Sequence, residues 1–396
     1  MTKDKADVLV IGAGLMGSAA ARHCADAGAS VILIGPDEPP DLRNHTGVFA
    51  SHYDEGRITR TLDRSAVWGE LARRSMERYA ALEDRTGIDF HESRGFLRVD
   101  PPGSPAPDDV GKVEKELKAS YQTLSPGELK AQLPDFDFPE GYTGMLERGL
   151  AGVINPRRLL EAQHEALRLA GGRVIRHVVH RLDRDGGAFA VRVPEGTIRA
   201  ERLIVATGAV TGLRPLTPER VPLRVAVETV WLARVTEGEA ARMTASPPLP
   251  GLWYEMDWHA TIPHIYFLPP IRYPDGHWYL KIGGDADPGV PLENMEDVRR
   301  FFAAGGTATR AVELREIIHR LLPRLSLDQG MAMPCILCYT AHGRPYIHQF
   351  PDGTVVAAGG NGSAAKSSDE IGRLAARRSL GLESDPTLPD ALFEIR

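Results

Sequence analysis

The chain has 396 residues, and its 47 Lys and Arg residues against 53 Asp and Glu residues give a formal net charge of -6. This length is sufficient for two domains, and the mild acidic balance argues against a nucleic-acid-binding or polybasic membrane-binding surface. No apolar run reaches the length of about eighteen residues that a transmembrane helix needs, and the short polar segment 1–6 does not resemble the start of a signal peptide. We therefore expect a cytoplasmic protein, monomeric or a small homo-oligomer, with no nucleic-acid or membrane partner.

The first predicted element is the hydrophobic strand 8–11, which leads into a glycine-rich turn and then into the alanine-rich helix 18–27. This arrangement forms a cradle for a dinucleotide: the first glycine permits the tight turn, the second lets the backbone approach a pyrophosphate, and the third lets the helix pack on the strand. By itself the turn fits NAD, NADP or FAD. The residues expected to contact the cofactor here are Gly12, Ala13, Gly14, Leu15, Met16 and Gly17.

The second strand of such a unit, predicted at 30–34, normally ends near an acidic residue that binds the cofactor ribose. This chain has Gly35 at that place, and Asp37 and Glu38 follow two and three residues later. We take Asp37 as the candidate ribose ligand.

A second group of predicted elements lies between residues 66 and 208. Helical periodicity over 66–85 predicts one scaffold helix, and Asn155-Pro156 predicts the start of a helix that runs to Ala170. Strand-like segments follow at 174–179, 189–193 and 202–208, and the last of them ends in Ala-Thr-Gly. We expect two further cofactor contacts there, at Val179 and Gly208.

Residues 221–285 are rich in β-branched and aromatic residues, which predicts an antiparallel sheet forming one wall of a substrate pocket. Helical sequence follows at 295–325, and the chain then returns to a strand at 354–358, a glycine loop, and a helix beginning near Lys366. A loop that leads into a helix presents free amides and the positive end of the helix dipole. The loop residues expected to contact the cofactor are Gly359, Gly360, Asn361 and Gly362.

Together these segments predict an α/β chain of two domains, a Rossmann-like cofactor-binding domain and a substrate domain with a large, mainly antiparallel sheet. The cofactor-binding domain is expected to be discontinuous, formed by residues 1–95, 150–215 and 330–385. The substrate domain is expected to comprise residues 96–149 and 216–329.

The three cysteines, Cys24, Cys335 and Cys338, argue against a disulfide framework. The spacing of Cys335 and Cys338 fits a metal or redox pair, two buried inert thiols, or a special role for one of them. Zinc would need two further ligands, and the surrounding apolar run 331–339 is typical of a strand. We expect no metal site.

Four short stretches resemble the amino-acid-oxidase type of FAD flavoproteins, and more closely the group of monomeric sarcosine oxidase and N-methyltryptophan oxidase. The stretches are Ser51–Arg60, Tyr266–Pro269 with Tyr279–Gly284, Cys335–Thr340, and Ala357–Ser367. At low identity the resemblance covers nearly the whole chain. It implies FAD as the cofactor, attached covalently through Cys335 by a thioether to its 8α-methyl group.

The resemblance also implies residue roles. It places His52 and Arg57 beside the flavin and makes Lys281 the residue that activates oxygen. Asp285 stands where sarcosine-type enzymes have a histidine, and a carboxylate there attracts a cationic or hydroxylated group, so sarcosine itself is not the expected substrate. The residues implied in substrate binding are Arg60, Lys366, Tyr266 and Asp285.

From these features we expect oxidation of a secondary or N-methyl amino acid, or a related amine, to an imine. The hydride goes to FAD, and O2 is reduced to H2O2. Two alternatives stay open: a D-amino-acid or cyclic imino-acid oxidase or dehydrogenase, and a non-catalytic flavin-binding subunit.

Overall fold

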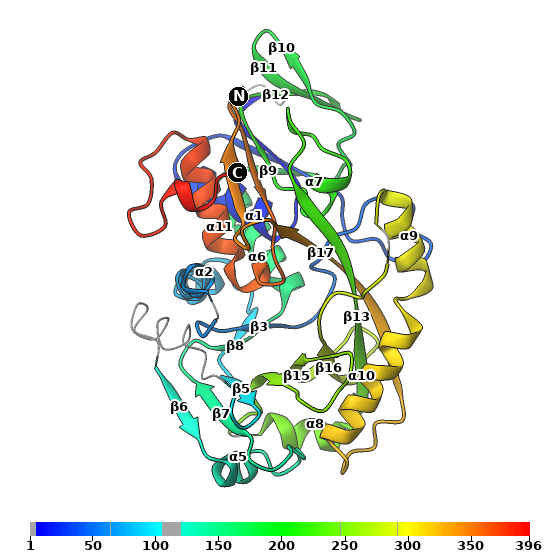
Figure 1. The fold of residues 1–396 in the computed structure, drawn as a ribbon. Coiled ribbons are helices and arrows are strands. Elements are labelled where there is room, and N and C mark those ends of the chain that lie inside the picture. Colours follow the sequence, from blue (N-terminus) through cyan, green and yellow to red (C-terminus); the bar gives the residue numbers. More distant parts are fainter. Residues whose placement is uncertain (1–4, 64, 105–119, 246, 291) are drawn as a thin grey trace.

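The computed structural model describes residues 5–63, 65–104, 120–245, 247–290 and 292–396. Figure 1 shows one sheet at the end of the molecule that carries both chain termini and a second sheet at the opposite end. A small three-stranded sheet, β3 (Arg57–Thr59), β8 (Gly152–Ile154) and β4 (His91–Glu92), lies between them.

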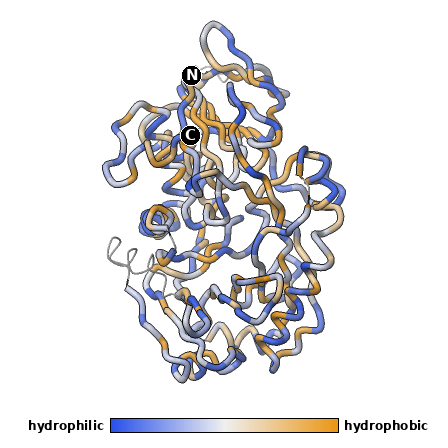
Figure 2. Tube along the Cα trace, viewed as in Figure 1, coloured by the Kyte–Doolittle hydropathy of each residue, from blue (hydrophilic) through white to orange (hydrophobic). Residues whose placement is uncertain are grey.

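The first sheet has eight strands around a parallel centre. The strand β1 pairs in parallel with β2 and with β12, while β2 pairs in parallel with β9 and β12 with β19. The central residues of these strands are buried on both faces and are therefore apolar, as Figure 2 shows for this region. The strands are β1 (Lys5–Ile11), β2 (Val31–Ile34), β9 (Arg173–Ile175), β10 (Asp183–Asp185), β11 (Ala188–Val193), β12 (Gly196–Val205), β18 (Tyr346–Gln349) and β19 (Thr354–Ala358).

Helices α1 (Leu15–Asp26), α6 (Pro156–Leu169) and α11 (Ala364–Ser379) pack together beside this sheet. Their small residues allow close approach: a Cβ added to Gly372 of α11 would lie 2.5 Å from Cβ of Ala19 in α1. The apolar residues between helices and sheet include Val10, Ala20 and Ile371. This packing holds the N-termini of α1 and α11 at the carboxyl ends of the parallel strands β1 and β19, where α/β proteins bind ligands.

The second sheet also has eight strands, which pair in antiparallel fashion except for the parallel pair β14 and β5. Its longest pair, β13 and β17, matches Leu223 with Thr340 at one end and Ala233 with Gly330 at the other. The strands in spatial order are β17 (Gly330–Thr340), β13 (Leu223–Val235), β16 (Trp278–Gly283), β15 (His264–Arg272), β14 (Gly251–Glu255), β5 (Phe96–Asp100), β7 (Thr143–Glu147) and β6 (Tyr121–Leu124).

Further helices of the described residues lie around these sheets. The helix predicted over 66–85 is two helices, because the hydrogen-bond pattern changes at Arg78, whose amide donates to the carbonyl oxygen of Ser75 three residues back. The helical region 295–325 is also divided, at Gly305-Gly306. These helices are α2 (Ala66–Met76), α3 (Tyr79–Thr86), α5 (Pro126–Gln132), α7 (Val210–Leu213), α8 (Glu237–Thr244), α9 (Met295–Ala304) and α10 (Ala308–Leu321), with a short 3-10 helix at Asp390–Leu392.

The predicted fold class, α/β with a Rossmann-like sheet and a large, mainly antiparallel sheet, is confirmed. Strand β17 differs from its predicted place: we expected residues 330–340 in the cofactor-binding domain, but they pair along their whole length with β13 of the second sheet. The ladder with β13 runs from Gly330 to Thr340, and its backbone hydrogen bonds hold β17 in the second sheet. The proposed domain boundaries otherwise stay a prediction.

Candidate active site

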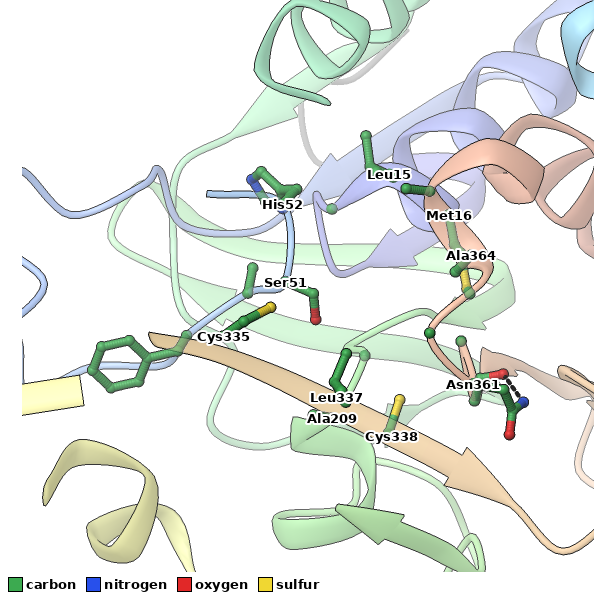
Figure 3. A pocket seen from close by; sticks show the side chains of 18 of the residues that line it. Leu15, Met16, Ser51, His52, Ala209, Cys335, Leu337, Cys338, Asn361 and Ala364 are labelled. Carbon is green, nitrogen blue, oxygen red and sulfur yellow. Dashed lines mark hydrogen bonds between the residues drawn. The ribbon is translucent and has the colours of Figure 1, made fainter. Parts of the chain in front are cut away.

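A cavity of about 550 Å³ is lined by residues of both large sheets. It extends from the glycine-rich turn before α1 to strand β17 and the loop before α11, as Figure 3 shows. The predicted site residues that line it are Gly12, Ala13, Gly14, Leu15, Met16, His52, Arg57, Arg60, Val179, Gly208, Tyr266, Asp285, Cys335, Gly359, Gly360, Asn361, Gly362 and Lys366.

The glycine-rich turn is shaped by close backbone contacts. Gly12 has a φ of 111°, which side chains other than glycine rarely adopt, and an added Cβ would lie 2.3 Å from the carbonyl oxygen of Ala206. Gly17 does not line the cavity but lets α1 approach the turn, since its Cβ would lie 1.9 Å from the carbonyl oxygen of Gly12. The N-cap of α1 is Gly14, which has no side chain to bond the first helical amides. Those amides suit an anionic group such as a pyrophosphate.

Asp37, the candidate ribose ligand, does not line this cavity. Its side chain is 66% exposed and pairs with Arg176, at 2.9 Å. Gly35 explains why no acidic side chain stands at the usual position: an added Cβ would lie 2.4 Å from the backbone nitrogen of Ala13 in the glycine-rich turn. The close packing of turn against strand leaves no room there, and the chain carries Asp37 to the surface.

The loop before α11 holds an unusual backbone. Asn361 has a φ of 48°, the left-handed region, which asparagine tolerates better than most residues. Its side-chain amide donates to the carbonyl oxygen of Gly359 at 2.7 Å, and its side-chain oxygen accepts from the amide of Thr340 in β17 at 3.0 Å. The first bond holds the shape of the glycine loop, and the second links the loop to β17, the strand that carries Cys335 and Cys338.

All three cysteines are buried and free. Cys335 and Cys338 both line the cavity from β17, and burial raises the pKa of each thiol. Arg57 lies 3.9 Å from the sulfur of Cys335 and lowers the pKa of that thiol in part. Within the described residues no group of three or more His, Cys, Asp or Glu residues is arranged to hold a metal ion.

His52 covers the glycine-rich turn, since its Nδ1 is the nearest atom to a Cβ added at Gly14, at 3.7 Å. Burial lowers the pKa of His52 to about 3, and the charges of His164, Arg157 and Arg57 contribute. The imidazole is therefore neutral at physiological pH.

Lys281 is 1% exposed and lies behind the cavity wall instead of lining it. Its ammonium group donates to the carboxylate of Asp54 and to the carbonyl oxygen of Gly56, at 3.3 Å. Asp54 is itself fully buried and also accepts from Arg57 and from the hydroxyl of Tyr273, at 2.6 Å. Burial, followed by the charge of Arg57, lowers the pKa of Lys281 well below its ordinary value. A network with one carboxylate between two cations thus stands next to Tyr266 and Cys335.

Arg60 and Lys366, the predicted carboxylate-binding pair, share an internal carboxylate. Asp63 lies 3.1 Å from Nζ of Lys366 and 3.5 Å from a guanidinium nitrogen of Arg60. Burial by itself raises the pKa of Asp63, but Lys366 and Arg60 hold it below its ordinary value. The charge of the buried Glu147 also acts on Arg60 and on Lys366, so two cations and two carboxyl groups lie together at this part of the cavity.

The outer part of the cavity is aromatic. The ring of Trp253 stacks on His264, with centroids 4.4 Å apart, and the guanidinium of Arg60 lies over Trp253 at 5.4 Å. Nε2 of His264 lies 3.2 Å from Asp285, whose side chain is 60% exposed. Asp285 therefore stands where the cavity meets solvent.

Sequence reasoning missed three buried carboxyl groups, Asp54, Asp63 and Glu228. Asp54 and Asp63 stand in a polar loop in which acidic residues are common. Glu228 carried a usable signal, because it is the acidic residue in the apolar strand 223–235.

Comparison with known proteins identifies the family. Residues 7–378 match the DAO family, described as FAD dependent oxidoreductase. The chain belongs to this family, so it is an FAD-dependent oxidoreductase. The glycine-rich turn, the uncapped start of α1 and the cavity lined by small residues fit such a dinucleotide.

Two curated relatives are similar to the chain. Human peroxisomal sarcosine oxidase is 25% identical over 393 residues, 96% of this chain and 93% of the relative. Monomeric sarcosine oxidase from Bacillus sp. (strain B-0618) is 29% identical over 206 residues, 51% of each chain.

Two solved structures share the fold. The open form of NikD, an amino acid oxidase essential for nikkomycin biosynthesis, aligns with a TM-score of 0.74 and 18% identity over 98% of both chains. Glycine oxidase from Geobacillus kaustophilus aligns with a TM-score of 0.73 and 18% identity over 100% of this chain and 99% of that one. Among the residues that the structure describes, no helix combines the length and apolar character needed to cross a membrane.

Proposed function

We propose that the protein oxidises a secondary or N-methyl amino acid, or a related amine, to an imine, with O2 as the electron acceptor and H2O2 as product. The observation that carries this proposal is the single cavity that joins a dinucleotide-binding turn at one end to the cluster of Arg60, Asp63 and Lys366 at the other. The names of the related sarcosine oxidases support an amine substrate.

When bound, FAD supplies the acceptor for the hydride removed from the carbon next to the amine. The protein's own residues bind and orient the substrate. The cations Arg60 and Lys366 attract a substrate carboxylate, and the planar guanidinium of Arg60 suits its two oxygens. Trp253 and Tyr266 supply an aromatic surface that excludes water from the bound amine.

A screen of amines tests this function directly. The purified flavoprotein would be mixed under anaerobic conditions with N-methyl amino acids, D-amino acids, pipecolate and proline, and flavin bleaching would be recorded before peroxide is measured in air. We expect bleaching with at least one secondary amine that carries a carboxylate. Bleaching by none of these amines would contradict the proposal and favour a non-catalytic flavin-binding subunit.

A second candidate is a dehydrogenase that passes electrons to an acceptor other than oxygen, acting on a D-amino acid or a cyclic imino acid. It is favoured by the pairing of Lys281 with Asp54, because an ammonium already bound to a carboxylate offers less charge to stabilise reduced oxygen. Lys281→Met separates the two candidates. In an oxidase, this variant is expected to slow reoxidation by air about 100-fold or more while anaerobic bleaching persists.

The exposed Lys130→Met is the matched control and is expected to change neither rate. Equal reoxidation rates in the wild type and in Lys281→Met would remove the oxygen-activating role of Lys281 and favour the dehydrogenase.

We further propose that Cys335 carries the flavin through a thioether to its 8α-methyl group. The bond replaces one C–H and one S–H bond by C–S, and the two electrons and two protons released convert O2 to H2O2. Its support is the position of Cys335 on the cavity wall next to Arg57, whose charge offsets part of the rise in the thiol pKa that burial causes. After acid precipitation the wild-type pellet is expected to be yellow, as is that of Cys338→Ser, while Cys335→Ser releases its flavin. A colourless wild-type pellet would contradict the bond.

A further inference from the structure

A buried carboxyl group, that of Glu228, lies in the wall of the cavity at the middle of β13. The residue is 5% exposed, lines the cavity, and pairs across the sheet with Cys335 of β17. Removing a carboxyl group from water costs several kcal/mol unless partners compensate. The position therefore calls for an explanation in terms of what Glu228 contacts.

The surrounding strands are built to let the hydroxyl of Tyr266 reach this group. Tyr266 lies on β15, and β16 runs between β15 and β13. Gly283 of β16 leaves the necessary space, because an added Cβ would lie 2.2 Å from the Tyr266 hydroxyl oxygen and 2.7 Å from Oε1 of Glu228. Through this opening the Tyr266 hydroxyl donates a hydrogen bond to Oε1 of Glu228 at 2.7 Å.

Charged and titratable groups surround Glu228 from every strand packed against it. Lys281 faces it from β16, Arg57 from β3, Cys335 from β17, Tyr266 from β15, and Asp287 from the segment after β16. Burial raises the pKa of Glu228 to about 7, with Asp287 adding to the rise, while the Tyr266 hydrogen bond, Lys281 and Arg57 act in the opposite direction. The carboxyl group thus has a proton affinity suited to exchange near neutral pH.

The other carboxyl groups on the cavity wall are engaged differently. Among the described residues that line it, these are Asp63 and Asp285. Asp63 is held by both Arg60 and Lys366, and Asp285 is largely exposed beside His264. Glu228 is the one of the three that is buried without a direct ion pair to the carboxylate-binding cations.

We propose that Glu228 binds the ammonium group of the substrate and accepts its proton, so that the amine is neutral when it is oxidised. The inference rests on the amine oxidation proposed above. An aliphatic amine is mostly protonated at neutral pH, and a protonated nitrogen has no lone pair to assist hydride removal. In this step one N–H bond of the substrate breaks and one O–H bond forms on Glu228, and no electrons are exchanged. The substrate carboxylate then lies toward Arg60 and Lys366, and the amine toward Glu228 and Tyr266.

The first test compares Glu228→Gln with the wild-type holoenzyme. The amide preserves the shape and still accepts from Tyr266, but it does not take up a proton. With an amine that bleaches the wild type, we expect anaerobic bleaching at neutral pH to slow by about 10²- to 10⁴-fold, with partial recovery in alkaline solution where free amine is abundant. Glu228→Asp is expected to keep the wild-type pH dependence at a lower rate, and the exposed Glu201→Gln to behave as wild type.

The second test uses Tyr266→Phe and measures the midpoint of the pH profile for bleaching, which a purely structural role of Tyr266 would not shift in a fixed direction. Loss of the hydroxyl removes a donor that stabilises the carboxylate, so the midpoint of the pH profile for bleaching is expected to move to higher pH. A midpoint that stays in place or moves lower would contradict the link between Tyr266 and Glu228.

A second readout does not depend on turnover. The probe is 2-methylalanine, an amino acid with no hydrogen on the carbon that carries the nitrogen, so it binds as a substrate analogue without being oxidised. On the alkaline side of neutrality its addition is expected to produce the infrared C=O band of a protonated carboxyl group, absent in Glu228→Gln.

Equal bleaching rates and pH profiles in wild type and Glu228→Gln, or no difference between their infrared spectra, would overturn the inference while leaving amine oxidation intact. Failure of every amine to bleach the wild type would instead refute the proposed function.

Discussion

The two ends of the cavity are built in different ways. The end at α1 is made of backbone and small residues from separate turns, among them Gly12 and Gly14 before α1 and Gly359 before α11, and each turn is shaped within its own short stretch of chain. The other end is made of charged side chains from separate parts of the fold, such as Asp63 after β3, Glu228 of β13 and Lys366 of α11. One end therefore depends on local geometry, and the other depends on how distant segments pack.

Charge shows the same contrast. The helix start at Gly14 has no side-chain cap, so a ligand can use the helix amides directly. At the opposite end, Arg57 and Lys281 share Asp54, and Arg60 and Lys366 share Asp63. Each of these carboxylates is shared by two cations, so a substrate carboxylate joins an existing set of ion pairs.

The largest expected effect comes from filling the backbone-built end. Gly12→Ala places a Cβ 2.3 Å from the carbonyl oxygen of Ala206 at a φ of 111°, and we expect loss of flavin and a fall in the free energy of unfolding of about 3 kcal/mol or more. Gly28→Ala is the matched control, because Gly28 also has a positive φ, 90°, but nothing within 4 Å.

Backbone strain alone is expected to cost Gly28→Ala about 1 kcal/mol, with normal flavin content. Flavin absorbance per protein and urea unfolding measure both effects. If the two variants lose equal stability and both retain flavin, close packing at the turn is not what shapes this end.

The next effect tests the paired charges. Lys366→Met removes one partner of the buried Asp63 while Arg60 remains, and we expect a loss of about 3 kcal/mol in unfolding free energy. In the double variant Lys366→Met with Asp63→Leu, the buried carboxylate is gone and most of that stability should return. Binding of substrate carboxylates should stay weak in both.

Urea unfolding of the wild type, both single variants and the double variant gives the coupling energy of the pair. A coupling energy near zero would show that Asp63 and Lys366 do not depend on each other.

The smallest expected effect is the change of stability with pH that comes from His52, which lies over the glycine-rich turn. The folded protein holds the pKa of His52 at about 3, whereas the unfolded chain has a value near 6.5. The unfolded chain therefore binds more protons between these pH values, so this contribution to stability is complete above about pH 6.5 and falls with acidification by about 1.4 kcal/mol per pH unit. His52→Asn should lose less stability than the wild type between pH 6 and pH 5, by about 1 kcal/mol.

His180→Asn, at an exposed histidine, should keep the wild-type pH dependence. The measurement is urea unfolding at both pH values, and a slope in His52→Asn as steep as that of the wild type would mean that His52 is not the buried neutral group described.

The elements that sequence predicted well are those whose shape follows from neighbouring residues. Strand β19 occupies residues Thr354–Ala358, and α6 begins at Pro156 after its Asn155 cap, because apolar runs, caps and glycines act locally. The helix over 66–85 was wrong as a single element, since the apolar periodicity continues across Glu77 and Arg78, where the structure ends one helix and begins the next.

The charged residues escaped prediction for a physical reason. Asp63 matters because folding brings it to Lys366, more than three hundred residues away in sequence, within 3.1 Å. Asp37 was taken as the ribose ligand because an acidic residue usually stands near the end of the second strand. In this chain the close contact between Gly35 and Ala13 leaves no room for a side chain at that position. Glu228 stood out as an acidic residue in its strand. Its hydrogen bond with Tyr266 could not be predicted, because it depends on the space that Gly283 leaves between the two side chains.

The shared carboxylates have a consequence for altering substrate preference by mutation. Because Asp63 is shared by two cations, exchanging a single member disturbs buried charges: loss of Asp63 leaves two cations together, and loss of either cation takes one partner from the carboxylate. Libraries that vary one position at a time would discard such variants as unstable before their activity was seen. New preferences at this site are more accessible when Arg60, Asp63 and Lys366 are randomised together, with members of opposite charge added or removed as a unit.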